Sequence, residues 1–239
     1  SYEQIKNIIS LGDYKEIMKD IYDNDKIASE LVVNFDVYNN FNKNEIVSLL
    51  YYFGYLTIKE SLTSLNYIFT IPNKVIRRVY GDYYINILNE YNINTVSDME
   101  TTADNEIMNN GKIDKLCEYI SYLLKNADNR LYINFTEKDL QIMIYAILSR
   151  YLEMNVSLEY QSNDNYIDIM IFKNKSTKYN IMIELKYLKK REGRLYNKKE
   201  KEAVSQINNY LEGVNLDKDT LKKYTVVFIG SDYKLKELK

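Results

Sequence analysis

Two carboxylates and an amine lie on two segments in the second half of the chain whose apolar pattern predicts strands. Asp168 stands in the run Tyr-Ile-Asp-Ile-Met-Ile-Phe at residues 166–172, and Glu184 and Lys186 follow Ile-Met-Ile in residues 180–187. Residues two apart in a strand point to the same face, so Glu184 and Lys186 project together. If the two strands pair as a hairpin, Asp168 can lie opposite them on the same face of the sheet.

Such a cluster would be costly without a cation, because neighbouring carboxylates repel each other and buried charges lose their hydration. Mg²⁺ compensates well, since it takes oxygen ligands and keeps several waters. Lys186 could then orient or activate a water near the metal, or stabilise negative charge that develops on a phosphate. The alternative is an ordinary solvent-facing strand, because Glu-x-Lys by itself is a weak motif.

The absence of histidine narrows the chemistry further. The 239 residues contain no histidine, which excludes Ser-His-Asp and Cys-His catalysis, histidine nucleases and histidine-ligated zinc. Catalysis must therefore use carboxylates, lysine, tyrosine or a metal with oxygen ligands. The net charge of −2 argues mildly against indiscriminate coating of nucleic acid, although basic charge can still be local.

The composition is that of a folded chain outside the membrane. Hydrophobic residues make up 46% and charged residues 28%. No apolar run approaches the ~20 residues of a membrane span, and no signal peptide opens the sequence, so we expect no membrane contact and a cytoplasmic location. The single cysteine, Cys117, cannot form an internal disulfide and is expected to be a small buried hydrophobe.

The two halves of the chain differ in their periodicity. The first half is mostly helical in pattern, with apolar positions at helical spacing in residues 2–33, including Tyr14, Ile17, Ile21, Ile27 and Leu31. Two short alternating runs, 55–60 and 66–71, predict one small β-hairpin. The other predicted helices cover residues 44–53, 74–91, 97–109 and 112–126.

The second half has the pattern of an α/β domain. A helix over residues 136–152 precedes three strands, 156–160, 166–172 and 180–187; a helix over 198–211 then leads to a strand at 224–229. The order α-β-β-β-α-β predicts a central mixed sheet between helices. Because a helix separates the third and fourth strands, those two strands should be parallel. We place the boundary between a helical domain, 1–126, and this domain, 127–239, near Ala127.

The pattern Asp168 followed by Glu184-x-Lys186, within α-β-β-β-α-β, resembles the PD-(D/E)XK or restriction-endonuclease-like nuclease superfamily. There the Asp and Glu hold the metal and the Lys assists the attacking water. The resemblance therefore implies those roles here, with Mg²⁺ or Mn²⁺ as cofactor. Ile167 stands where many members have proline, a position that varies in the superfamily.

Two flanking residues match less specific parts of the same pattern. Glu137, near the start of the preceding helix, resembles an acidic residue that reaches the metal in some branches. Its alternative role is a capping or helix-dipole carboxylate. Gln206, on the following helix, resembles a glutamine found near the substrate or the water, so the resemblance adds it to the catalytic set.

A second resemblance covers the first half. Residues 49–58, Leu-Leu-Tyr-Tyr-Phe-Gly-Tyr-Leu-Thr-Ile, and 71–75, Ile-Pro-Asn-Lys-Val, are similar to the end of the AAA-ATPase-like region in a bacterial family with a C-terminal PD-(D/E)XK domain. No G-x-x-x-x-G-K-[ST] motif occurs, so we expect no ATP binding by these residues. We therefore expect the ATPase core of that family to be absent from this chain, either because it was removed or because this member never had one; the start on a helical segment suits a fragment.

Positive charge is concentrated directly after Lys186. A phosphate-backbone clamp beside the site is the functional interpretation, and a solvated loop and helix face is the alternative. Tyr187 and Tyr196 are interleaved with these charges and could stack on bases. The residues expected to contact nucleic acid are Lys189, Lys190, Arg191, Arg194, Lys198 and Lys199.

These observations predict a metal-dependent nuclease that hydrolyses phosphodiester bonds, with DNA preferred over RNA as substrate. Paired cuts in duplex DNA would need two such sites, so a homodimer is one expected assembly. The alternative function is a catalytically inactive nucleic-acid-binding or protein-interaction module that keeps the fold. Retention of Asp168 and Lys186 favours activity.

Overall fold

The chain forms two compact units. The computed structural model describes residues 5, 7, 8, 17, 20, 21, 26–35, 40–151, 153–162, 165–211 and 216–238. Its units are Ser1–Tyr83 and Tyr84–Lys239. This division lies well before Ala127, where the sequence pattern placed the boundary.

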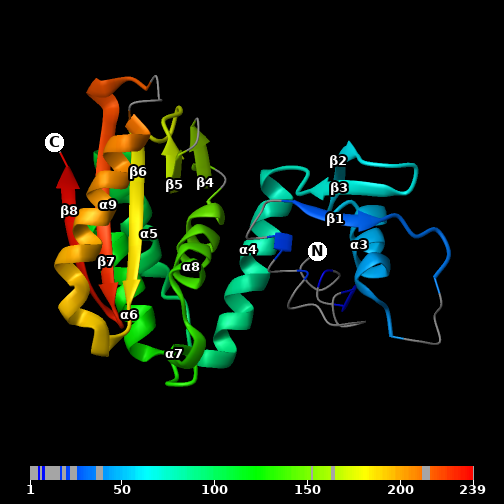
Figure 1. Ribbon diagram of the computed structural model, residues 1–239, viewed down its shortest axis with the longest axis horizontal. Coiled ribbons are helices and arrows are strands. Elements are labelled where there is room, and N and C mark those ends of the chain that lie inside the picture. The colour runs from blue at the N-terminus through cyan, green and yellow to red at the C-terminus, as the bar shows by residue number, and fades with distance from the viewer. Residues whose placement is uncertain are drawn as a thin grey trace. The chain divides into compact units, whose positions relative to one another are not determined.

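The first unit contains a small antiparallel sheet and a helix, seen in blue and cyan in Figure 1. Helix α3 (Lys43–Tyr52) begins at Asn42, which forms a capping box with Glu45. Strands β2 (Thr57–Ser61) and β3 (Asn66–Thr70) form the predicted hairpin.

A third strand in this unit corrects the helical prediction for residues 27–31. Strand β1 (Ile27–Glu30) pairs with β3, with Ile27 opposite Phe69, and gives the strand order β1-β3-β2. Four residues are too few to show a strand period, and the free edge of β3 decides their conformation. Ile17 and Ile21 are helical, whereas Tyr14 lies outside the described residues.

The second unit contains the predicted α-β-β-β-α-β order. The boundary between the units falls within α4 (Lys74–Leu88), which the short 3₁₀ segment Asn89–Tyr91 follows. The later elements are α5 (Ser97–Asn110), α6 (Asp114–Asn126), α7 (Leu131–Asn134), α8 (Glu137–Ser149), β4 (Asn155–Ser162), β5 (Asn165–Phe172), β6 (Asn180–Leu188), the 3₁₀ segments Lys190–Leu195 and Lys218–Thr220, α9 (Tyr196–Leu211), β7 (Leu221–Ile229) and β8 (Asp232–Leu238).

The sheet has the order β4-β5-β6-β7-β8. Strands β6 and β7 are parallel and α9 connects them, which confirms the predicted crossover. All other pairs are antiparallel. Strand β8 was not predicted, because its alternating charges in Asp-Tyr-Lys-Leu-Lys-Glu-Leu describe a half-exposed edge strand rather than a buried one.

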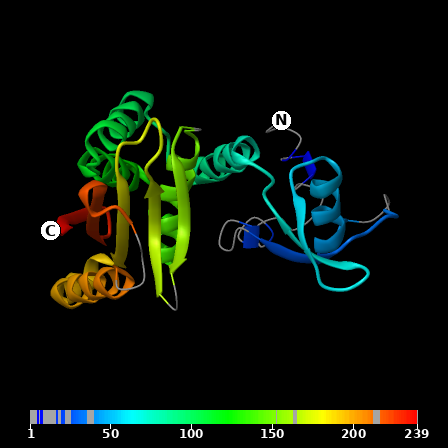
Figure 2. The same cartoon turned by 90° about the horizontal axis from the view of Figure 1, so that it is seen from above.

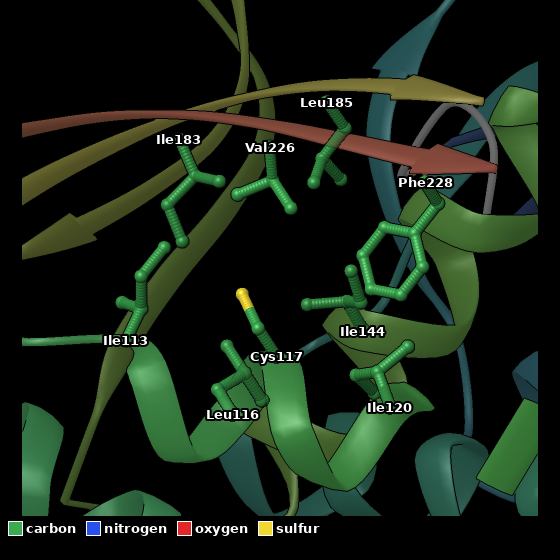
Figure 3. A pocket seen from close by; sticks show the side chains of 9 residues that line it. All are labelled: Ile113, Leu116, Cys117, Ile120, Ile144, Ile183, Leu185, Val226 and Phe228. Carbon is green, nitrogen blue, oxygen red and sulfur yellow. The ribbon is translucent and has the colours of Figure 1, made fainter. Parts of the chain in front are cut away.

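Helices cover both faces of this sheet (Figure 1 and Figure 2). On one face, Met170 and Met182 pack with Ile207 and Tyr210 of α9. On the other face, α6 and α8 pack over side chains of β6 and β7, as Figure 3 shows around Cys117. The side chains that enclose this apolar space are Ile113, Leu116, Cys117, Ile120, Ile144, Ile183, Leu185, Val226 and Phe228.

Hydrogen bonds join α5 and α6 to the sheet, which explains why the unit begins so early. The Tyr224 hydroxyl donates to the Gly111 carbonyl at 2.9 Å, and the Ser121 hydroxyl donates to the Ser231 carbonyl at 2.7 Å. Gly111 ends α5 with φ of 65°, and an added Cβ would lie 2.7 Å from the Tyr179 ring. The helices predicted at 97–126 therefore belong to the same compact unit as the sheet.

Two composition-based expectations concern single features of the described chain. Cys117 is buried and free, and burial raises the pKa of its thiol, as expected of a small hydrophobe. Across the parts of the chain that the structure describes, no helix has the length and apolar character needed to cross a membrane.

Candidate active site

The site lies where strands β5 and β6 separate. Their ladder ends at the pair Ile169–Ile183, one residue before Asp168 and Glu184 would face each other. Asp168 Oδ2 instead accepts the backbone N–H of Leu185 at 2.7 Å. The Asp168 carboxylate thus satisfies a backbone N–H that has no carbonyl partner on β5 where the ladder has ended.

Glu184 and Lys186 meet just beyond the end of this ladder. Lys186 Nζ donates to Glu184 Oε1 at 2.8 Å. Lys186 is only 6% exposed and Glu184 only 1%. Lys186 Nζ also lies 3.3 Å from Glu137 Oε1. The structure therefore brings together the core residues Asp168, Glu184 and Lys186, as the spacing predicted, with Glu137 beside them.

Glu137 reaches the site because another residue caps its helix. Thr136 forms the capping box of α8 with Asp139. Glu137 Oε2 accepts the backbone N–H of Tyr187 at 3.0 Å, so the first turn of α8 holds the end of β6. Asp139, not Glu137, forms the capping box, so that alternative is wrong for Glu137; Glu137 still lies in the first turn of α8, where a helix-dipole carboxylate belongs, and its carboxylate is directed toward Lys186.

Burial and like charge make the carboxylates reluctant to ionise. Burial raises the pKa of Asp168 to about 6, against the opposing effects of Lys186 and the Leu185 N–H. Burial raises the pKa of Glu184 to about 8, and Asp168 adds to the rise. Burial lowers the pKa of Lys186, but the charges of Glu184 and Asp168 outweigh it and the pKa is raised. The cluster therefore has too little positive charge to balance its carboxylates when they are ionised.

Because of this charge imbalance, the stability of the metal-free protein should depend on pH. Both carboxyl groups bind protons more tightly in the folded than in the unfolded state, so the free energy of unfolding should fall as pH rises from about 4 to about 8. Melting temperatures in EDTA across this range check it. In a double Asp168→Asn, Glu184→Gln variant, the melting temperature should fall less steeply with pH. The pH dependence that remains comes from Asp104, because burial raises its pKa to about 7. A wild-type protein that melts higher at pH 8 than at pH 5 contradicts the expectation.

The residues present fit a divalent cation. Glu184 Oε2 is buried and has no hydrogen-bond partner within the described chain, so a lone pair is free in a site that needs positive charge. No group of three or more His, Cys, Asp or Glu side chains in metal-binding arrangement occurs among the described residues. Mg²⁺ commonly uses one or two carboxylates and completes its shell with water and phosphate oxygens, which Asp168 and Glu184 suit.

Sequence reasoning missed two residues at the site. Gln141 Nε2 donates to Asp168 Oδ1 at 2.7 Å. Its signal was a lone amide within the apolar run of α8, one helical turn after Glu137. Glu159 of β4 adds to the rise of the Asp168 pKa and forms a 2.6 Å ion pair with Lys138. Nothing in its sequence context distinguishes Glu159 from a solvent-facing strand residue.

Glu159 has a strained backbone, which leads to a stability prediction. Its φ is 44°, in the left-handed region, within a strand. Replacing it with glycine should stabilise the fold by about 1 kcal/mol, because the strain exceeds the value of the exposed ion pair with Lys138. The melting temperature should rise by about 2–4 °C. Glu159→Ala is the control, since it removes the same ion pair but keeps the strain. A glycine variant no more stable than the alanine variant would show that the strain is absent.

The other predicted residues lie outside the cluster. Gln206 is exposed on α9, and no hydrogen bond or ion pair joins it to Asp168, Glu184 or Lys186 in the described chain. Lys198 and Lys199 both pair with Glu202, at 4.0 and 2.7 Å. Lys190, Arg191 and Arg194 are exposed in the segment after β6, and Lys189 is half-buried and donates to the Ile133 carbonyl.

The two interleaved tyrosines already have partners. Tyr187 packs edge-on against Phe135, with ring centroids 5.1 Å apart. Lys234 Nζ lies 3.9 Å from the centroid of the Tyr196 ring. Each ring is therefore already held by a contact within the second unit.

Comparison with known proteins agrees with the geometry of the second unit. Residues 135–238 match the family model of the PD-(D/E)XK nuclease superfamily. The match begins two residues before α8 and runs through β8, so it covers the whole α-β-β-β-α-β core and the four clustered residues. It indicates a restriction-endonuclease-like core and a nuclease-type function. No curated protein matches the chain.

Proposed function

We propose that this PD-(D/E)XK-type domain is an active metal-dependent phosphodiesterase, with DNA as its substrate in preference to RNA. The observation that carries the proposal is the unpartnered, buried Oε2 of Glu184 beside Asp168 and Lys186. Leaving a buried acceptor unsatisfied costs on the order of 1–3 kcal/mol, and here the acceptor lies among charged groups that suit a cation. Binding of a cation and a phosphate offers the missing partner.

Each residue has a definite task in this proposal. Asp168 and Glu184 would hold Mg²⁺ or Mn²⁺, which would polarise a phosphate oxygen and favour ionisation of a bound water. Lys186 would move from its ion pairs toward the phosphate or the water and stabilise negative charge there. Glu137 would hold the end of β6 through the Tyr187 N–H. Gln206 remains proposed as a substrate-side residue, since it is exposed on α9.

The alternative is a catalytically inactive module that binds nucleic acid or protein. It has one supporting observation, the Lys186 ammonium group that already links Glu184 and Glu137 and partly neutralises the cluster. We favour activity because Lys186 cannot satisfy Glu184 Oε2 in this arrangement. The resemblance of residues 49–58 and 71–75 to an ATPase-associated region further suggests a partner or preceding domain with ATPase character, and a homodimer would suit paired cuts in duplex DNA.

A cleavage assay tests the function directly. Linear duplex, supercoiled and single-stranded DNA, and RNA, would be incubated with the protein and Mg²⁺ or Mn²⁺, with EDTA in a parallel series. We expect cleavage of DNA that EDTA abolishes. Binding of the same substrates without cleavage under any metal condition would support the inactive module instead.

The exposed basic residues predict a salt-dependent affinity for nucleic acid. Each phosphate contact contributes about 0.9 to the slope of log affinity against log salt on duplex DNA. A triple variant, Lys190→Ala, Arg191→Ala and Arg194→Ala, should therefore lower this slope by about 2–3. Fluorescence anisotropy with labelled duplex at several salt concentrations measures it.

Two comparisons give this prediction its controls. Lys198→Ala with Lys199→Ala should lower the slope less, because Glu202 already neutralises part of their charge. Lys112→Ala with Lys115→Ala removes positive charge from the start of α6 and should leave the slope unchanged. An equal loss per removed charge in all three variants would mean that total charge, not this segment, governs binding.

A further inference from the structure

Gln141 has a buried side-chain amide in which only the nitrogen has a hydrogen-bond partner. It lies on α8, is 5% exposed, and its Nε2 donates to Asp168 Oδ1 at 2.7 Å. Its Oε1 is also buried and has no hydrogen-bond partner within the described chain. The neighbouring side chains of α8, from Leu140 to Leu148, are buried and apolar apart from Gln141 and the Tyr145 hydroxyl.

Stability alone does not explain why a glutamine stands at this position. An amide buried with an unpaired carbonyl loses its hydration without full compensation, and an apolar side chain of similar size would avoid that loss. The amide therefore has one structural partner that distinguishes it from leucine or methionine, the Asp168 carboxylate. Its function must be sought in what it does to that carboxylate.

Two donors fix the orientation of Asp168 before any cation binds. The Leu185 N–H holds Oδ2, and Gln141 holds Oδ1. Both donors are neutral, so they orient a charged carboxylate without the positive charge of a lysine or arginine, which would compete with a cation. Gln141 also lies one turn after Glu137, so the same helix supports Asp168 on β5 and Lys186 on β6.

We propose that Gln141 is a positioning residue that holds the Asp168 carboxylate for a divalent cation through the Nε2–Oδ1 hydrogen bond. The inference rests on the proposed function, since it assigns Asp168 as a metal-holding group. Partners that orient metal-binding side chains typically change metal affinity by about 10–100-fold when they are removed. Gln141 would belong to this class although it touches neither metal nor substrate.

Titration of the metal-free protein with Mn²⁺ by calorimetry, without nucleic acid, tests the role. Gln141→Met keeps the length of the side chain and removes the donor, so we expect its Mn²⁺ affinity to be about 10–100-fold weaker than that of the wild type. Gln141→Leu serves as a second variant with the same expectation. Ser149→Ala is the matched control: it removes a buried polar group from the far end of the same helix and should leave the affinity unchanged.

Melting temperatures without metal show whether each variant is folded. A folded Gln141→Met or Gln141→Leu protein that binds Mn²⁺ as tightly as the wild type overturns the positioning role but leaves the proposed function standing. Wild-type protein that binds no Mn²⁺ and cleaves nothing overturns both. A purely structural role would lower the melting temperature of the variants without weakening Mn²⁺ binding in the folded protein, and that result also contradicts the proposal.

Discussion

Asp168→Asn should lower the rate of metal-dependent cleavage by about 1000-fold or more, because a metal ion contributes several kcal/mol to the transition state and each ~1.4 kcal/mol is tenfold in rate. The same substitution should leave the fold intact or make it more stable. It removes a partly buried charge whose pKa is raised to about 6, and asparagine has nearly the same shape. Loss of activity with gain of stability is the result expected of a functional, rather than structural, carboxylate.

The hydrogen bonds of Asp168 can survive this change. The asparagine oxygen can keep the Leu185 N–H, and its Nδ2 can donate to the unpartnered Oε1 of Gln141 if that amide turns over. Cleavage rates at saturating Mn²⁺ and melting curves at pH 8 measure the two effects. Asp217→Asn, at an exposed carboxylate before β7, is the matched control: it should leave the cleavage rate unchanged, and it should not raise stability, because hydrogen bonds and Lys173 lower the pKa of Asp217. Cleavage within tenfold of the wild type would remove Asp168 from the proposed metal site.

Lys186→Met should have the second largest effect, on both activity and stability. Removing one partner of a buried ion pair typically costs about 3–5 kcal/mol, because the other charge is left unpaired. Glu184 can avoid part of this cost by taking up a proton, since its pKa is already raised to about 8. The loss of stability should therefore be greatest above pH 8 and shrink as pH falls toward 6.

Activity should fall about 100–1000-fold in this variant, as when a single preorganised donor to a developing negative charge is lost. Urea unfolding at pH 6 and pH 9, together with cleavage rates, checks both effects. Lys222→Met is the matched control, because its ion pair with Glu237 is solvent-exposed and should contribute little at either pH. A stability loss that is independent of pH would show that Glu184 stays ionised without Lys186.

Local periodicity determined much of the second unit. The apolar runs at residues 166–172 and 180–187 are properties of a few adjacent residues, so they predicted two strands with Glu184 and Lys186 on one face. The length and apolar pattern of the segment between β6 and β7 predicted a helix, and a helix between neighbouring strands requires a parallel crossover. These features depend on the chain within one or two elements, and the structure contains them all.

The edges of both sheets depended on more distant parts of the chain. Strand β1 forms because β3 offers an unpaired edge, and β8 pairs with β7 in the same way. The compact unit begins before Ala127 because Tyr224 and Ser121 join helices and strands that are more than 100 residues apart. Neither kind of contact leaves a periodic mark in the sequence.

The site shows the same division. Residue types and spacing alone indicated Asp168, Glu184 and Lys186, since clustered charges on apolar strands demand an explanation. Only the tertiary structure showed that the strands separate beside them, that Gln141 reaches Asp168, and that Glu202 engages Lys198 and Lys199. Hydrogen bonds and ion pairs between side chains depend on distances of a few ångströms, and those distances are set by packing between elements rather than by sequence order.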